Sequence, residues 1–157
     1  MPIVRDEAKR KEIIDLLTRA YWMELETVQN YIANSINLDG VRAEEIKKSL
    51  LADITTEVAH AQQFGRRIKE LYGVVPGSLA FRAEQRFLQP PADTTDVAAV
   101  IRGVIDAEQG AIDHYLKIIK TCGDDDPVTA DMVTTILADE QGHLRMFEGF
   151  LKEYEKR

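Results

Sequence analysis

Two short stretches of the chain, Glu57-Val58-Ala59-His60 and Glu140-Gln141-Gly142-His143, share one pattern. Each places a glutamate and a histidine three residues apart. In an α-helix, residues at that spacing lie on one face about a turn apart, so both side chains can reach one metal ion. A Glu-x-x-His pair on each of two helices, with a single Glu on each of two others, is the ligand set of dinuclear carboxylate bundles. The motif therefore predicts such a bundle, provided that the rest of the chain supplies four helices.

Four segments carry apolar residues at a spacing near 3.6, which predicts four long α-helices and an all-α fold. We expect these helices over residues 6–37, 42–72, 95–121 and 126–155. Residues with strong positional preferences mark the expected ends, with helix starts at Asp6, at Asp93 to Thr95 and at Asp126-Pro127, and helix ends at Gly73 and Gly123. A short turn at Asp39-Gly40 makes the first two helices antiparallel neighbours.

The connection between the second and third helices is long. Residues 73–92 contain the prolines and glycines Gly73, Pro76, Gly77, Pro90 and Pro91. A tight helix hairpin needs only a few residues, whereas about twenty residues can run the length of a bundle as a crossover. The chain suits one domain over residues 1–157. The expected fold is a four-helix bundle with a long crossover between helices 2 and 3.

One glutamate in each predicted helix falls within the apolar stripe: Glu24, Glu57, Glu108 and Glu140. Burying such a carboxylate without a cation costs on the order of several kcal/mol. Two divalent cations would balance the four negative charges and leave both histidines neutral. The pattern predicts a dinuclear metal site with the ligands Glu24, Glu57, His60, Glu108, Glu140 and His143. Oxygen donors with two imidazoles suit two iron ions per chain, with manganese as the alternative metal.

Two further ionisable residues are expected to lie outside this site. Glu26 follows Glu24 by two positions, so its side chain should point elsewhere on the helix and be solvated. His114 follows Glu108 by six positions, which places it on the far side of the helix. We expect His114 at the surface or at an interface, and not as a metal ligand.

Composition and charge argue against several classes of partner. The net charge is −7 and no basic stripe with interleaved aromatics occurs, so a nucleic-acid partner is not expected. No apolar run approaches the length of a membrane span, and the first residues lack the apolar core of a signal peptide. The single cysteine, Cys122, allows no intrachain disulfide and fits a reducing cytosol. We therefore expect a cytoplasmic protein.

The order and spacing of the motifs carry a family resemblance. Glu57 follows Glu24 by 33 residues, and Glu140 follows Glu108 by 32, so the chain consists of two similar helix-pair halves. The matching stretches are Glu24-Leu25 with Tyr31 seven residues after the glutamate, Glu57-x-x-His60-Ala61, and Asp139-Glu140-Gln141-Gly142-His143. Together they resemble the ferritin-like superfamily of di-iron carboxylate proteins, and most closely the bacterioferritins.

The resemblance implies a ferroxidase-type centre that oxidises ferrous iron with dioxygen or peroxide. By likeness to that family, Glu57 and Glu140 would bridge the two metals. Glu24 with His60, and Glu108 with His143, would each complete one metal position. Tyr31 resembles the family's tyrosine beside the centre and joins the six ligands as a candidate catalytic residue. Val58 stands where bacterioferritins often carry a haem-ligating methionine, so no haem is expected.

Other functions use the same ligand set. A rubrerythrin-like peroxidase, an oxygenase and a manganese catalase are alternatives, although the chain has no Cys-x-x-Cys pairs for an internal rubredoxin. An iron-storage cage subunit and a metal-free interaction bundle are the other two classes. Fourteen residues follow His143, too few for a fifth helix, so we expect a homodimer in preference to a larger cage. The large residues expected at the dimer contact are Tyr21, Trp22, Ile36, Phe81, Phe87 and Leu88.

Overall fold

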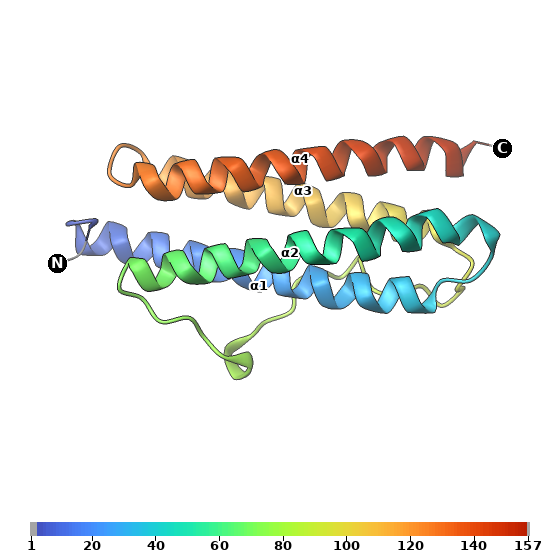
Figure 1. Ribbon diagram of the computed structural model, residues 1–157, viewed down its shortest axis with the longest axis horizontal. Coiled ribbons are helices and arrows are strands. Elements are labelled where there is room, and N and C mark those ends of the chain that lie inside the picture. Colours follow the sequence, from blue (N-terminus) through green and yellow to red (C-terminus); the bar gives the residue numbers. More distant parts are fainter. Residues whose placement is uncertain (1–2, 157) are drawn as a thin grey trace.

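The computed structural model describes residues 3–156 and contains four long α-helices (Figure 1). Their bounds are α1 Glu7–Asn37, α2 Glu44–Glu70, α3 Val97–Cys122 and α4 Pro127–Glu155. Two short 3-10 turns, η1 Val41–Ala43 and η2 Ser78–Ala80, lie in the first two connections. The described residues include no strand, which confirms the all-α prediction. None of the helices in this range is both long and apolar enough to cross a membrane.

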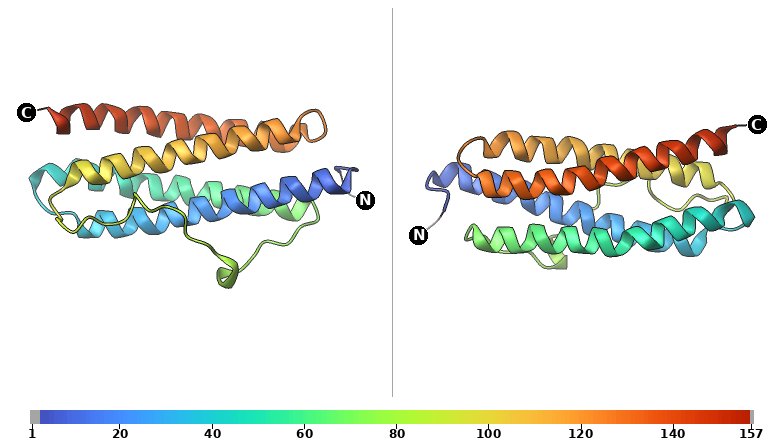
Figure 2. Two further views of the ribbon diagram at one scale, coloured as in Figure 1. Left: turned by 180° about the vertical axis from the view of Figure 1, so that it is seen from behind. Right: turned by 45° about the horizontal axis from the view of Figure 1, so that its top comes forward.

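The helices are arranged as two antiparallel pairs, α1 with α2 and α3 with α4 (Figures 1 and 2). The crossover, residues 71–96, leaves the end of α2 and runs the length of the bundle to the start of α3. As a result, α2 and α3 point in the same direction, as the long connection predicts. The last described residues at the two ends of the chain lie at opposite ends of the bundle (Figure 1).

Aspartates cap three of the helix starts. Asp6 and Asp126 cap α1 and α4 as predicted, each accepting the backbone N–H three residues on, at 3.1 and 3.0 Å. The cap of α3 is Asp96, which accepts the N–H of Ala99 at 3.1 Å. The predicted start at residues 93–95 was therefore wrong. Asp93 instead accepts the N–H of residue 95 at 2.9 Å, in the turn before the helix.

The end of α2 also differs from the prediction. Tyr72, not Gly73, takes the left-handed backbone conformation, with φ of 67°. The Gly73 N–H donates to the carbonyl oxygen of Ile68 at 2.9 Å and closes the helix. Glycine is needed at this position for space, since a Cβ would lie 2.9 Å from Ile68 Cγ2 and 3.0 Å from Ile14 Cγ2.

A belt of buried polar residues divides the apolar core in two. The cluster nearer the start of α1 includes Ile13, Leu17, Phe64, Ile118 and Val133. The cluster at the opposite end includes Ile46, Leu50, Ile101, Val104 and Phe147. The four glutamates of the apolar stripes lie between them, because each occupies a core position in the middle of its helix.

Polar contacts hold the crossover against α1. Glu26 is only 4% exposed and accepts the backbone N–H groups of Glu84 and Gln85 at 2.7 and 2.9 Å. The expectation that Glu26 is solvated was therefore wrong. Two backbone donors from the crossover replace water around this carboxylate, so it can be buried with its hydrogen bonds intact.

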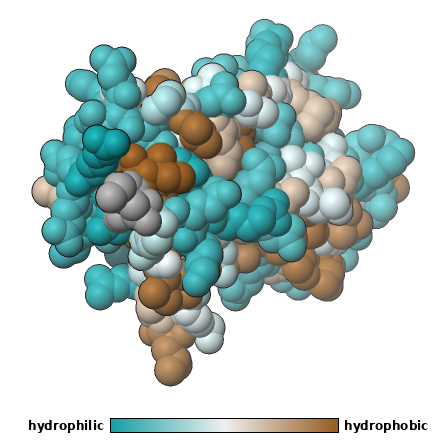
Figure 3. All heavy atoms as spheres, turned by 60° about the vertical axis from the view of Figure 1, so that its left-hand side comes forward, coloured by the Kyte–Doolittle hydropathy of each residue, from teal (hydrophilic) through white to brown (hydrophobic). Residues whose placement is uncertain are grey.

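The later part of the crossover packs closely on the bundle, whereas its middle projects. Leu88 is buried, and its carbonyl oxygen accepts Asn34 Nδ2 at 2.9 Å. On the α3 side, a Cβ at Gly103 would lie 2.4 Å from the carbonyl oxygen of Phe87, so the approach requires glycine. Around η2, the crossover stands away from the helices and exposes Leu79 completely. Figure 3 shows this projection, at the bottom of the view, as largely apolar.

Candidate metal centre

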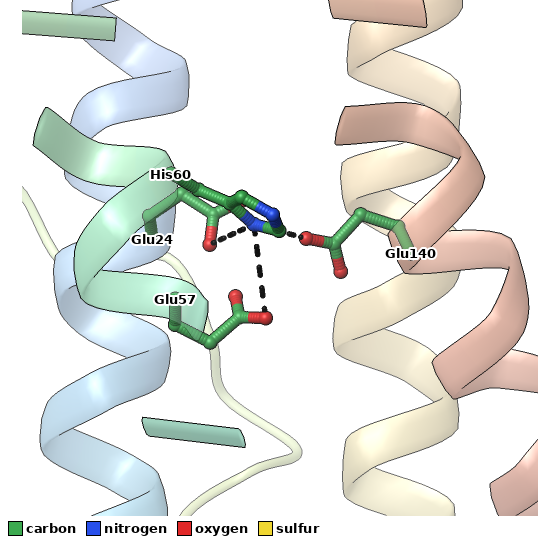
Figure 4. Close-up of side chains that lie close together, drawn as sticks. All are labelled: Glu24, Glu57, His60 and Glu140. Carbon is green, nitrogen blue, oxygen red and sulfur yellow. Dashed lines mark ion pairs between the residues drawn. The ribbon is translucent and has the colours of Figure 1, made fainter. Parts of the chain in front are cut away.

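The six predicted ligands converge between the two apolar clusters. Glu24 comes from α1, Glu57 and His60 from α2, Glu108 from α3, and Glu140 and His143 from α4. Figure 4 shows four of them, Glu24, Glu57, His60 and Glu140, pointing toward one another from three helices. The side chains of the four glutamates and of His60 are 1–2% exposed, and that of His143 is 16% exposed.

The six side chains form two overlapping groups of four. One group is Glu24, Glu57, His60 and Glu140, and the other is Glu57, Glu108, Glu140 and His143. Within each group, one ligand atom from every residue lies within 4.8 Å of the others. Metal–ligand bonds of about 2 Å place neighbouring ligand atoms roughly 3–4 Å apart, so each group is close to the size of one coordination sphere. Glu57 and Glu140 belong to both groups and lie between the two positions.

Each of the six residues has a buried polar atom that makes no well-aligned hydrogen bond, although two of these atoms, His60 Nδ1 and Glu140 Oε1, lie 3.0 Å apart as an ion pair. These atoms are Glu24 Oε2, Glu57 Oε1, His60 Nδ1, Glu108 Oε2, Glu140 Oε1 and His143 Nδ1. Buried polar atoms in folded proteins are nearly always hydrogen-bonded, so six such atoms in one place require an explanation. Two cations would give a partner to all six. The donor set, four carboxylates and two imidazoles, fits hard divalent ions such as ferrous iron or manganese.

The pKa values of the four glutamates reflect the energetic cost of burying several carboxylates close together, away from water. Burial, reinforced by neighbouring carboxylates, raises the pKa of Glu24, Glu57 and Glu108 well above the usual 4.5. Burial also acts to raise the pKa of Glu140, but the neighbouring Glu108 and His60 outweigh it and the pKa is lowered. Without cations, protons must therefore neutralise most of the cluster, and cations would displace those protons.

A buried tyrosine contacts each of the two unshared glutamates. The Tyr31 hydroxyl donates to Glu108 Oε1 at 3.1 Å, so Tyr31 contacts one of the predicted ligands. The Tyr115 hydroxyl donates to Glu24 Oε1. Sequence reasoning missed the second contact, although Tyr115 follows Glu108 by the same seven residues that separate Tyr31 from Glu24. Each tyrosine therefore holds the glutamate of the other helix pair.

An aspartate lies beside the outward-facing nitrogen of each histidine. His60 Nε2 donates to Asp139 Oδ2 at 2.8 Å, and His143 Nε2 lies 3.5 Å from Asp53 Oδ1. In each case the aspartate belongs to the helix that carries the other histidine. Burial lowers the pKa of His60, but Glu140 and Asp139 more than offset this and raise it to about 9. Neither aspartate was predicted to act, and only the position of Asp139 within the second motif hinted at it.

His114 takes no part in the centre, but its surroundings differ from the prediction. It is buried, and its Nε2–H donates to the carbonyl oxygen of Leu16 at 2.8 Å. The expectation of a surface histidine was wrong because this side of α3 packs against α1. The third histidine is thus a packing residue between two helices.

Most of the chain matches known proteins. The ferritin-like domain family matches residues 14–157. The bacterioferritin of Desulfovibrio desulfuricans is 28% identical over 143 residues, which is 90% of this chain and 75% of the bacterioferritin.

Solved structures support the same relationship. The X-ray structure of Desulfovibrio desulfuricans bacterioferritin, which describes a diiron site in different catalytic states, has a TM-score of 0.78 at 26% identity, covering 93% of this chain and 81% of that one. A dodecameric thioferritin from Bacteroides fragilis shares the fold, with a TM-score of 0.83 at 24% identity over 92% of this chain and 87% of its own. Because the family match spans nearly the whole sequence, the chain belongs to the ferritin-like family, as its motifs predict.

Proposed function

We propose that the chain is a ferroxidase-type protein that binds two ferrous ions and oxidises them with dioxygen or peroxide. The observation that carries this proposal is the pair of overlapping ligand groups, with a buried atom on all six residues that makes no well-aligned hydrogen bond. The similarity to a bacterioferritin whose structure has a diiron site supports it. Two ferrous ions held side by side supply two electrons to one oxidant. With two protons, those electrons convert dioxygen into hydrogen peroxide, or hydrogen peroxide into two waters.

The residues have distinct tasks in this proposal. Glu57 and Glu140 would hold both ions, because they belong to both groups. Glu24 with His60 completes one position, and Glu108 with His143 completes the other. The four carboxylate charges balance two divalent ions, so the loaded site is neutral while the histidines are uncharged.

The protein around the ligands sets their direction and limits access of water. Tyr31 holds Glu108 by a hydrogen bond at 3.1 Å, so the second oxygen of that carboxylate is free to bind metal. Tyr115 does the same for Glu24. The two apolar clusters close the site along the bundle axis, which keeps the electrostatic interactions inside it strong.

Iron is the metal we propose, with manganese as the alternative for the same oxygen-rich ligands. We propose no haem, since Val58 has no ligating atom at the position where a methionine would bind it. A cytoplasmic location remains our expectation, and the buried free thiol of Cys122 suits a reducing compartment.

We expect the chain to form a homodimer through the outer face of α1 and the crossover. Tyr21, Trp22 and Phe81 line a surface pocket of about 310 Å³ between these two segments, and Ile36 and Phe87 are exposed. Burying such apolar surface is the main driving force of association, and a two-fold pair is its commonest closed form. Leu88 cannot contribute to the predicted dimer contact, because its side chain is buried inside the monomer.

Light scattering after size exclusion measures the assembly directly. A particle of two chains supports the homodimer. A particle of twelve chains, the state of the Bacteroides fragilis thioferritin, or of a larger shell would contradict it and favour iron storage as the function.

The proposed activity is tested by anaerobic titration with ferrous iron, followed by dioxygen. We expect two ions per chain and an oxidation rate well above that of buffer. Glu108→Ala should slow oxidation to near the buffer rate, because the two ions are needed together. Glu148→Ala, an exposed glutamate on α4, is the matched control and should change nothing. Wild-type oxidation by the Glu108 variant would show that the chemistry takes place elsewhere on the protein.

A further inference from the structure

Two cavities lie on opposite sides of one crossover residue. On the outside, a surface pocket of about 220 Å³ is lined by Glu26, Ala83, Glu84, Gln85, Arg86 and Gln89. On the inside, a cavity of about 10 Å³ is lined by the four ligand glutamates together with Gln85 and residues of α1 and α3. That volume holds about one water molecule. Gln85 is the residue that lines both the outer pocket and the cavity of the candidate metal centre.

The position of Gln85 follows from the path of the crossover. The left view of Figure 2 shows the crossover passing over the face formed by α1 and α3. Its backbone is bound there by Glu26, which accepts the N–H groups of residues 84 and 85. The Gln85 side chain is half-buried and inserts toward Thr27, which also lines the inner cavity.

Neutral hydrogen bonds alone hold this side chain in place. Gln85 Nε2 donates to Thr27 Oγ1 at 2.5 Å and lies 3.4 Å from the carbonyl oxygen of Met23. Gln85 Oε1 accepts Asn30 Nδ2 at 3.0 Å. No charge is buried by these contacts, and the backbone contacts to Glu26 do not depend on the side chain. An outward rotation of the amide would break these side-chain contacts and leave the crossover bound to α1 through Glu26.

We propose that Gln85 is a movable gate through which divalent cations pass from the crossover face to the metal centre. The inference rests on the proposed di-metal site. The chemistry along the path suits a cation, because Met23 O, Thr27 Oγ1 and Gln85 Oε1 are oxygen donors that can replace lost waters. Carboxylates line both ends, with Glu26 and Glu84 outside, where Arg19 pairs with Glu84 at 3.0 Å, and the four ligand glutamates inside.

A competing way to the centre would pass His143 instead of Gln85. His143 is the most exposed of the six ligands, and Asp53 lies beside it. If cations enter there, changes at Gln85 leave their binding rate unaltered. The two routes therefore make opposite predictions for one variant.

The test follows cobalt(II) binding to metal-free protein by stopped-flow absorbance, without dioxygen. Gln85→Ala should raise both the association and the dissociation rate by about tenfold or more, since a closed gate is open in only a minor fraction of molecules. The dissociation constant and the stoichiometry of two ions should not change, because the variant alters the path and not the ligands. Glu148→Ala, at an exposed position of α4 outside both cavities, is the control and should leave both rates unchanged, whereas Gln89 is unsuitable because its Nε2 donates to the carbonyl oxygen of Gln85 at 2.9 Å.

Each of the other possible outcomes would contradict the proposal that Gln85 is a gate for cations. Unchanged rates in a Gln85→Ala protein that still binds two ions mean that cations enter elsewhere, although the metal centre itself stands. A changed dissociation constant with an unchanged association rate means that Gln85 acts on bound metal. If only the reaction of preloaded protein with dioxygen accelerates, the path serves the oxidant and not the cation. Failure of the wild-type protein to bind cobalt would instead refute the proposed metal site.

Discussion

The two halves of the candidate metal centre use the same residue types but differ in how firmly they hold their histidine. His60 is 2% exposed, with Nε2 bound to Asp139 at 2.8 Å and Nδ1 only 3.0 Å from Glu140. His143 is 16% exposed, its Nε2 lies 3.5 Å from Asp53, and its Nδ1 is 3.6 Å or more from the glutamates around it. One half is already close to a ligand geometry, whereas the other must contract to reach it.

This difference suggests an order of events. A histidine whose outer nitrogen donates to a carboxylate has its tautomer and ring orientation fixed, which directs the other nitrogen at the metal. His60 meets that condition and His143 does not. We therefore expect the first ion to bind on the His60 side and the second ion to draw His143 inward. The preformed half would also lose less conformational freedom on binding.

Removing a shared glutamate should have the largest effect, because it acts on both halves. We expect Glu57→Ala to bind at most one of the two ions and still fold, since a buried carboxylate is costly without metal. Metal analysis together with circular dichroism measures both outcomes. A Glu57→Ala protein that retains two ions would remove this residue from the ligand set.

Replacing Asp139 and Asp53 by alanine tests whether the two halves differ in how firmly they hold their histidine. Loss of a carboxylate that orients a metal-bound histidine typically weakens metal binding about 10- to 100-fold. We expect Asp139→Ala to weaken the tighter of two calorimetric binding steps by that amount. Asp53→Ala should weaken the other step less than about tenfold, because its 3.5 Å separation is not a hydrogen bond. Equal losses for both variants would show that the two halves become equivalent once metal is bound.

Much of this centre could be predicted from the sequence, because helix periodicity places residues on faces without knowledge of the fold. The registers of Glu24, Glu57, Glu108 and Glu140 follow from the apolar stripes, and all four are buried. The two histidines follow from their spacing to a glutamate. Tyr31 came from family likeness, and its hydroxyl does reach Glu108.

The features that were missed depend on contacts between segments. Glu26 is buried because the crossover brings two backbone N–H groups to it. The pattern of side chains in the sequence does not show where a backbone N–H group will lie. His114 is buried because α1 offers the carbonyl oxygen of Leu16. Asp53 and Asp139 act across helices, so their partners depend on how α2 and α4 are aligned. Among these residues, only Tyr115 could have been predicted, because it follows Glu108 by the same seven residues by which Tyr31 follows Glu24.

A pH series separates Glu140 from the other three glutamates, because the pKa of Glu140 is lowered whereas those of Glu24, Glu57 and Glu108 are raised. A carboxyl whose pKa is higher in the folded protein than its ordinary 4.5 adds stability at low pH, which is lost as the pH rises through the folded value. Burial and neighbouring carboxylates give Glu24 and Glu108 this behaviour, and His60, raised to about 9, behaves likewise. Glu140, with its lowered pKa, acts oppositely and loses stability only as the pH falls below 4.5.

We therefore expect metal-free protein to unfold at a lower temperature as the pH rises from about 5 to about 9. Protein loaded with two ions should lack this trend, since cations take the place of the displaced protons. Thermal unfolding with and without metal measures both. Metal-free protein that is more stable at high pH would mean that the cluster does not hold its protons as its burial requires.

The smallest expected effect comes from the two tyrosines, which form one matching pair of contacts across the halves. Tyr31→Phe removes the hydrogen bond to Glu108, and Tyr115→Phe removes the one to Glu24. A buried hydrogen bond contributes about 1 kcal/mol net, so each variant should lower the free energy of unfolding of metal-free protein by about that amount. The ring of Tyr115 also packs on Phe64, with centroids 5.3 Å apart, and phenylalanine preserves that contact. Because Glu24 belongs to the firmly held His60 half, we expect Tyr115→Phe to cost more than Tyr31→Phe in urea denaturation. The reverse order would show that the firmness of the His60 half comes from Asp139 and does not extend to its glutamate.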